Sequence, residues 1–186
     1  MRTTTAVRPG GRSARVQQAV HDAVRQLADE VERDQLTIPL IAERAGVTPS
    51  TVYRRWGSLK ELMAHVAAER LKPEAEPQDT GSLAGDLLAW AGEFMEDMVS
   101  LPGQQVLADA LGSTDAALKG RCRQWQCDQV SLFLARAHAR GEIVSCDIDT
   151  LLDLIMGPLT YRLSYAPDTV SESWLRRCIA RALGSM

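Results

Sequence analysis

The chain has 186 residues, of which 45% are hydrophobic and 24% are charged, and its formal net charge is -3 at pH 7. It is long enough to bury a substantial core as one domain or as two small ones that share helices. Charge interrupts every apolar run before the roughly 18 residues that a membrane span needs, and no apolar secretory-signal segment is visible near the N-terminus. These features exclude a membrane-spanning protein and predict a globular protein of the cytoplasm.

Charge is unevenly distributed along the chain. Residues 1–72 contain 12 basic and 8 acidic residues, a balance of +4, whereas residues 73–186 contain 9 basic and 16 acidic residues, a balance of -7. The first turns of the chain carry Arg2, Arg8, Arg12 and Arg15 and no acid. This division predicts that the N-terminal part faces a polyanion and that the C-terminal part does not.

Residue types that carry metal or catalytic chemistry are sparse and scattered. The four cysteines, Cys122, Cys127, Cys146 and Cys178, have no C-x-x-C spacing, and the three histidines stand apart from them. We interpret the cysteines as reduced structural thiols. The chain also lacks G-x-S-x-G, H-E-x-x-H and a phosphate-binding glycine loop. We therefore expect no metal site, no cofactor and no enzymatic activity.

The N-terminal part has the pattern of several short helices. Apolar residues at i, i+3, i+4 and i+7 predict an amphipathic first helix over residues 11–33. Thr37 is placed to cap a short second helix, and Gly46 supplies the turn that ends it. Thr48 is then expected to cap a third helix that has Pro49 at its first position, where a missing N–H costs nothing.

The third predicted helix has one apolar face and one polar, basic face. Val52 and Trp56 lie four residues apart and point towards the core. The remaining side and its flanks carry Ser50, Thr51, Tyr53, Arg54 and Arg55. Short hydrogen-bonding side chains near the start of a helix suit close approach to the major groove of DNA. With its glycine turn, this pair of short helices matches a helix-turn-helix reader.

A boundary is predicted at residues 72–82, which hold two prolines and a glycine among charged residues. It separates a DNA-binding domain at residues 1–72 from a second domain at residues 73–186. Ser58 with Glu61 predicts a capping box that opens a fourth helix before the boundary. Further helices are expected over residues 83–101, 104–111, 116–140, 150–165 and 170–183, the last opened by Thr169 with Glu172. No run alternates as a strand does, so the fold is predicted to be all-α with about nine helices.

The segment TIPLIAERAGVTPSTVYRRWGSLKEL, residues 37–62, resembles the DNA-binding segment of TetR/AcrR-like transcriptional regulators. The positions that agree are Ala42, Ala45, Gly46, Val47, Tyr53, Trp56 and Leu62. In the C-terminal half, GPLTYRL at residues 157–163 is similar to a segment found in one branch of that family. The resemblance implies a three-helix DNA-binding head followed by a helical body that binds ligand and dimerises.

The resemblance also implies which residues meet DNA. The start of the third helix and Tyr53 are expected in the groove, and Arg55 is expected at a phosphate. The full expected set is Thr37, Thr48, Pro49, Ser50, Thr51, Tyr53, Arg54, Arg55, Ser58 and Lys60. Two departures from the family are visible. Leu59 stands where relatives commonly have a phosphate-contacting lysine, with Lys60 one place later, and Ile38 and Pro39 replace residues that are often polar.

A twofold DNA reader must hold two heads about 34–36 Å apart, so dimerisation is expected. The resemblance implies that the last two helices form the interface. Their apolar stripes contain Leu152, Ile155, Leu159, Leu163, Trp174, Leu175, Cys178, Ile179 and Ala182. The alternative is that these stripes pack only within their own subunit. Pro158, which follows Gly157 in the middle of a predicted helix, is expected to bend it.

A ligand pocket is predicted where the fifth and seventh helices carry more apolar width than one neighbouring helix covers. The candidate lining residues are Trp90, Phe94, Met98, Leu107, Trp125, Leu132 and Met156. Ordinary core packing is the alternative interpretation for each of them. Asp86, Glu93 and Asp97 share the opposite side of the fifth helix, where we expect them to be solvated and not to form a cation site.

Taken together, these patterns predict a homodimeric DNA-binding transcriptional regulator. On the family resemblance, it is a repressor that a small-molecule effector releases from a palindromic operator. Its expected partners are double-stranded operator DNA, the effector and a second copy of the chain. The alternative is an effector-independent DNA-binding interaction or architectural protein that acts through a protein partner, and a body without a cavity would favour it.

Overall fold

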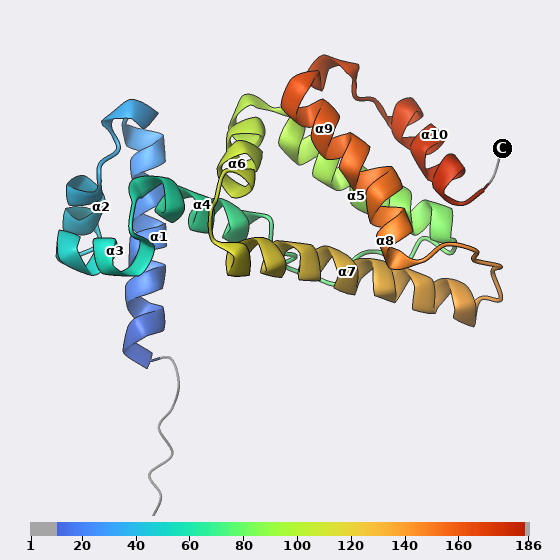
Figure 1. The fold of residues 1–186 in the computed structure, drawn as a ribbon, viewed down its shortest axis with the longest axis horizontal. Helices are drawn as coiled ribbons and strands as arrows, with labels where there is room; N and C mark the ends of the chain where they lie inside the picture. The colour runs from blue at the N-terminus through green and yellow to red at the C-terminus, as the bar shows by residue number, and fades with distance from the viewer. Residues whose placement is uncertain (1–10, 185–186) are drawn as a thin grey trace, which may run out of the picture. The chain divides into compact units, whose positions relative to one another are not determined.

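The computed structural model describes residues 11–184, and all regular secondary structure in that range is helical (Figure 1). The all-α prediction is therefore confirmed. The chain divides into two compact units, one ending at Val66 and the other beginning at Ala67. Arg2 and Arg8 of the basic N-terminal arm lie outside the described residues. None of the described helices combines the length and apolar character needed to cross a membrane.

The N-terminal unit contains the predicted short helices. They are α1 (Gly11–Glu30), a 3-10 turn (Arg33–Gln35), α2 (Ile38–Arg44), α3 (Pro49–Trp56) and the first part of α4 (Leu59–Arg70). The first helix ends three residues earlier than predicted. Glu32 has an extended backbone, with φ -63° and ψ 149°, and the turn after it lets Leu36 pack into the core at 4% exposure.

A single apolar cluster holds the three helices of the head together. Val20 and Val24 of α1 pack with Ile41 of α2 and Val52 of α3, and all four side chains are buried. Gly46 connects α2 to α3 with φ 65°, a conformation that side chains other than glycine rarely adopt. This turn fixes the direction of α3 relative to α2, because the buried faces of both helices must meet the same cluster.

The C-terminal unit is built around α5 (Leu83–Val99). It is contacted by α6 (Leu101–Leu111), α7 (Ala116–Ala139), α9 (Gly157–Tyr165) and α10 (Glu172–Ala182) (Figure 1). A short α8 (Ile148–Leu151) and a π-helical segment (Leu152–Met156) run directly into α9. If Ile148–Tyr165 is counted as one helix, residues 11–184 contain nine helices, as predicted.

The predicted irregularity at Pro158 takes the form of the π-helical segment that precedes it. The Gly157 N–H donates to the carbonyl of Leu152, five residues back instead of four. Pro158 has no N–H to donate, and the widened turn before it relieves the crowding that a proline ring causes in a regular α-helix. At the next helix the predicted cap is wrong, because Ser171, not Thr169, accepts the hydrogen bond from the Trp174 N–H of α10.

The expectation that Asp86 is solvated is also wrong, because its side chain is buried, with a residue exposure of 1%. Its carboxylate accepts hydrogen bonds from the Thr80 N–H and the Thr80 hydroxyl, both at 2.7 Å, and from Arg140 at 3.1 Å. Arg140 also pairs with Glu142 at 2.7 Å. The Glu142 carboxylate in turn accepts from the Leu83 N–H at the start of α5. These bonds fasten the segment before α5 to the end of α7.

Candidate nucleic-acid interface and ligand pocket

One face of α3 is exposed and carries the side chains predicted to meet DNA. Val52 and Trp56 are buried at 0% and 6% exposure, which fixes the helix rotation. Pro49, Ser50, Tyr53 and Arg54 are exposed on the other side, and Tyr53 is 51% exposed. Tyr53 thus adds a large aromatic side chain to the polar surface of this short helix. The helix therefore offers hydroxyl, phenol and guanidinium groups to a groove.

The two threonines that precede α2 and α3 behave differently. Thr37 caps α2 as predicted, because its Oγ1 accepts from the Leu40 N–H at 3.3 Å. Thr48 stands at the N-cap of α3 but makes no side-chain hydrogen bond to the backbone, so the predicted capping contact is absent. Its hydroxyl instead lies 3.0 Å from Ser50 Oγ and 2.9 Å from Thr51 Oγ1. Three hydroxyls are thereby gathered at the start of α3.

Arg55 differs from the expectation of a side chain free to meet phosphate. Its guanidinium donates to the Ser13 carbonyl and Ser13 Oγ, both at 3.0 Å, and to Gln17 Oε1 at 2.9 Å. It also lies over the Trp56 ring, 5.3 Å from the centroid. In the absence of DNA, Arg55 thus joins α3 to the first turns of α1. Local spacing does not indicate this contact, because the partners are 42 and 38 residues away.

The other predicted backbone contacts are available on the surface. Arg54 and Lys60 are exposed and have no hydrogen-bond or ion-pair partner within the described part of the chain. Ser58 acts as predicted in the capping box, since its Oγ accepts from the Glu61 N–H at 3.2 Å. Arg54 and Lys60 are therefore the cations of this face best placed to take a phosphate or a base edge.

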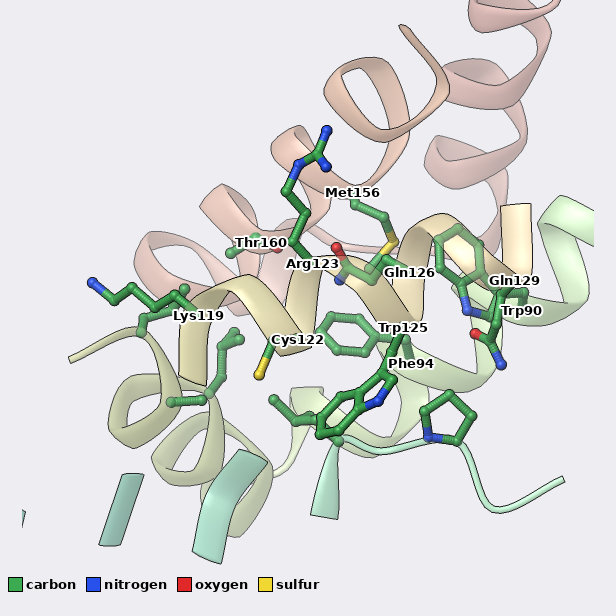
Figure 2. A pocket seen from close by; sticks show the side chains of 15 residues that line it. Trp90, Phe94, Lys119, Cys122, Arg123, Trp125, Gln126, Gln129, Met156 and Thr160 are labelled. Carbon is green, nitrogen blue, oxygen red and sulfur yellow. The ribbon is translucent and has the colours of Figure 1, made fainter. Parts of the chain in front are cut away.

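The C-terminal unit contains a pocket of about 360 Å³ (Figure 2). Five of the seven predicted residues line it: Trp90, Phe94, Leu107, Trp125 and Met156. Met98 and Leu132 do not. Met98 is buried in the core at 2% exposure, and Leu132 lies further along α7 than any lining residue of that helix.

Several lining residues were missed by the sequence reasoning. They are Leu71, Pro73, Ala110, Leu111, Lys119, Cys122, Arg123, Gln126, Gln129 and Thr160. On α7 the spacing of Lys119, Cys122, Gln126 and Gln129 is that of one helical face, so the pattern was present. It was overlooked because a polar helical face is ordinarily solvated. Pro73 falls in the predicted boundary at residues 72–82 and Leu71 directly precedes it, and a boundary segment carries no helical pattern that indicates a pocket.

Comparison with known proteins agrees with this architecture. The model of the tetR family of bacterial regulatory proteins matches residues 21–66, and the model of the tetracyclin repressor-like C-terminal domain matches residues 77–182. The chain belongs to the TetR family. It is a DNA-binding transcriptional regulator of that family, as the resemblance of its helix-turn-helix segment implied.

Individual TetR-family relatives match over most of the chain. An uncharacterized HTH-type regulator, YdeS of Bacillus subtilis, is 28% identical over 171 residues, 88% of this chain and 86% of that protein. The DNA-binding transcriptional repressor TetR of Mycobacteroides abscessus is 31% identical over 139 residues, 70% of this chain and 73% of its own. The crystal structure of the TetR family regulator SCO0332 has a TM-score of 0.65 and 26% identity, covering 93% of this chain and 97% of that one.

The predicted dimer-interface residues of this TetR-family chain lie mostly in the interior of the C-terminal unit. Leu152, Ile155, Leu159, Leu163, Trp174, Leu175, Ile179 and Ala182 are each no more than 9% exposed, and Cys178 is partly buried. These stripes pack against the core of their own subunit, and their role in a dimer interface stays a prediction. Leu154, Tyr161 and Tyr165 are the exposed large hydrophobic residues of the same helical run, at 44%, 65% and 77%.

Proposed function

We propose that the chain is a homodimeric repressor that binds a palindromic operator and leaves it when a small molecule occupies the pocket of the C-terminal unit. The observation that carries the proposal is the pairing of an exposed reading face on α3 with a pocket in the other unit. Repression, as opposed to activation, is supported by the TetR relative of Mycobacteroides abscessus, which is named a repressor. A cytoplasmic, non-enzymatic role is part of this proposal.

The α3 face supports base reading by Ser50, Tyr53 and Arg54. Arginine can bond two acceptors of guanine at once, and hydroxyl groups can bond any base edge. Lys60 adds a backbone contact that carries no sequence information. Because each phosphate contact releases counterions, affinity for the operator should fall steeply as salt increases.

A dimer interface formed by α8, the π-helical segment, α9 and α10 is supported by the exposed apolar residues there. Tyr161 and Tyr165 lie four residues apart on α9, which places them on one side of that helix, and Leu154 is exposed in the π-helical segment before it. The two tyrosine rings lie 5.1 Å apart between centroids. Two aromatic residues exposed together form the kind of patch that a second copy can cover. The Tyr161→Ser/Tyr165→Ser variant is therefore expected to be monomeric in analytical ultracentrifugation, while the wild type is dimeric.

Effector control is supported by the position of Leu71 and Pro73 in the pocket wall. These two residues directly follow α4, whose first part belongs to the DNA-binding unit. A ligand that touches them contacts residues of the C-terminal unit just beyond the end of that helix. It lowers DNA affinity only if it binds the operator-free arrangement more tightly, since a ligand shifts an equilibrium by its differential affinity alone. The pocket also argues against the effector-independent alternative, which called for a filled body.

The first test is selection of bound sequences from a random pool of DNA duplexes by the purified full-length chain. We expect a palindrome whose half-sites lie about one helical turn apart. Sedimentation of the protein with the selected duplex gives the stoichiometry. A folded protein that enriches no motif would contradict the proposed sequence-specific function.

A further inference from the structure

Three aromatic rings line the pocket of the C-terminal unit. Trp90 and Phe94 come from α5 and Trp125 from α7 (Figure 2). Trp90 is tilted against Phe133 of the core at 5.8 Å between centroids. Because Phe133 is completely buried, the indole has a fixed support. Such walls favour a flat ring that can stack or pack edge to face between them.

The polar groups of the pocket are two carboxamides and a hydroxyl without internal partners. Gln126 and Gln129 on α7 and the Thr160 hydroxyl on α9 line the pocket, and none of these side-chain groups has a hydrogen bond to another described residue. A carboxamide presents a donor and an acceptor together. A ligand that displaces water from these groups must bond to them, because a polar group desolvated without a partner costs free energy.

The charges around the pocket disfavour a cation. No carboxylate is among its lining residues. Arg123 is paired with Asp149 at 2.5 Å, and in Figure 2 its guanidinium points away from the aromatic side chains. Lys119 lines the pocket and has no ion-pair partner within residues 11–184. Burial raises the pKa of the Cys122 thiol, so this group is neutral near pH 7. An incoming cation would be repelled by the unpaired charge of Lys119, whereas an anion could form an ion pair with it.

We propose that this pocket takes a compact, flat aromatic molecule that is neutral or singly anionic. The molecule carries either a hydrogen-bond donor together with an acceptor, or an ionised acid group. The assignment names the chemical class of the effector and rests on the proposed function. The volume of about 360 Å³ lies near the lower end of the ~300–1,000 Å³ range of small-molecule sites. A fused bicyclic ring fits that size.

Four matched probes test the class on the full-length protein: 2-naphthol, 2-naphthoate, naphthalene and 2-naphthylmethylammonium. Affinities are measured by isothermal titration calorimetry. We expect naphthol and naphthoate to bind at least about tenfold more tightly than naphthalene, the equivalent of one good hydrogen bond. The ammonium compound is expected to be the weakest. The absence of binding by all four at their solubility limits would overturn the assignment, as would tightest binding by the ammonium compound.

Variants then assign the contacts. Gln126→Leu/Gln129→Leu should bring the affinity of naphthol close to that of naphthalene, and Trp125→Ala should weaken all bound probes. Gln124→Leu is the matched control, because Gln124 is an exposed glutamine on the same helix that bonds only to Asp128. An unchanged preference for naphthol in the double glutamine variant would contradict the role of the carboxamides.

Operator release is measured separately, by fluorescence anisotropy of the selected duplex. Probes that follow the class order in calorimetry but leave DNA binding intact would support the pocket chemistry and contradict the proposed release mechanism. If only cationic compounds release the operator, and they compete with naphthol for the pocket, the release mechanism would be supported and the proposed pocket chemistry would be contradicted.

Discussion

The reading face of α3 and the pocket of the C-terminal unit are built in opposite ways. The face belongs to one helix of eight residues, and its exposed side follows from the burial of Val52 and Trp56. The pocket is assembled from five segments between Leu71 and Thr160. A local site can be changed one side chain at a time, whereas an assembled site depends on everything that holds its walls together. The two regions should therefore respond differently to substitution.

The largest effect is expected on the face. Replacing Tyr53 or Arg54 with alanine should lower affinity for the selected operator by about 10- to 100-fold, since a good base contact provides ~1–3 kcal/mol of discrimination. The thermal midpoint should change little, because both side chains are exposed. Fluorescence anisotropy and circular dichroism measure the two quantities.

Arg176→Ala on α10 is the control for charge removal, since Arg176 is exposed and pairs only with Glu172 on the same helix. Loss of folding in Tyr53→Ala or Arg54→Ala would show that the face is not a purely local site.

In the C-terminal unit, Asp86→Ala should destabilise the fold and leave the chemistry of α3 intact. The substitution strands the Thr80 N–H and removes one partner of Arg140. We expect a loss of about 1–3 kcal/mol in the free energy of unfolding by urea, the usual cost of leaving a buried donor unsatisfied. Glu93→Ala, at an exposed position two turns along the same helix, should cost far less. Equal losses of stability in the two variants would mean that the hydrogen bonds of Asp86 with Thr80 and Arg140 add no measurable stability.

The same cluster predicts acid sensitivity. Burial raises the pKa of Asp86, but hydrogen bonds from Thr80 and Arg140 outweigh it and hold the pKa below its ordinary value. The Leu83 N–H, together with Arg140, lowers the pKa of Glu142. Both carboxylates therefore add stability that is present above their unfolded pKa values, near pH 4, and is lost as the pH falls through their folded values.

The wild type should lose stability from about pH 5 downwards, and Asp86→Asn should show a shallower dependence over the same range. Urea unfolding at a series of pH values measures the slope. An identical slope in both proteins would contradict the role assigned to Asp86.

A smaller effect is expected for Arg55, which connects the face to α1. Arg55→Ala should weaken operator binding about three- to tenfold by loosening the first turns of α1, the loss of about one hydrogen bond. Because Gln17 is a partner of Arg55, Arg55→Ala/Gln17→Ala should be little worse than Arg55→Ala alone. The slope of the logarithm of the binding constant against the logarithm of salt concentration gives a further check. If its magnitude falls by about one in Arg55→Ala, Arg55 contacts phosphate directly.

The smallest effect separates the two threonines. Thr37→Ala should reduce stability by about 0.5–1 kcal/mol, since Thr37 caps α2. Thr48→Ala should be close to neutral for stability, because its hydroxyl makes no backbone cap. Thermal denaturation compares the pair. A larger loss for Thr48→Ala would mean that the hydroxyl cluster itself holds α3.

The sequence predicted those features that local spacing determines. The head helices, the Gly46 turn and the inward positions of Val52 and Trp56 follow from helical period and capping chemistry. The contacts of Arg55 with Ser13 and of Asp86 with Arg140 could not be predicted in this way, because these partners are 42 and 54 residues apart. The stripes of α9 and α10 were correctly identified as apolar. Periodicity alone does not say whether such a stripe meets its own subunit or a second one.

The π-helical segment at Leu152–Met156 has an evolutionary consequence. A single π-turn is what one inserted residue leaves in a continuous helix, because the widened turn absorbs the extra residue and keeps the helix beyond it in nearly the same rotation. Deletion of one residue there should therefore restore regular winding and leave Thr160 on the wall that it shares with Met156. Gain or loss of one codon is thus a change that this helix can absorb without exchanging the side chains that it presents to a small molecule.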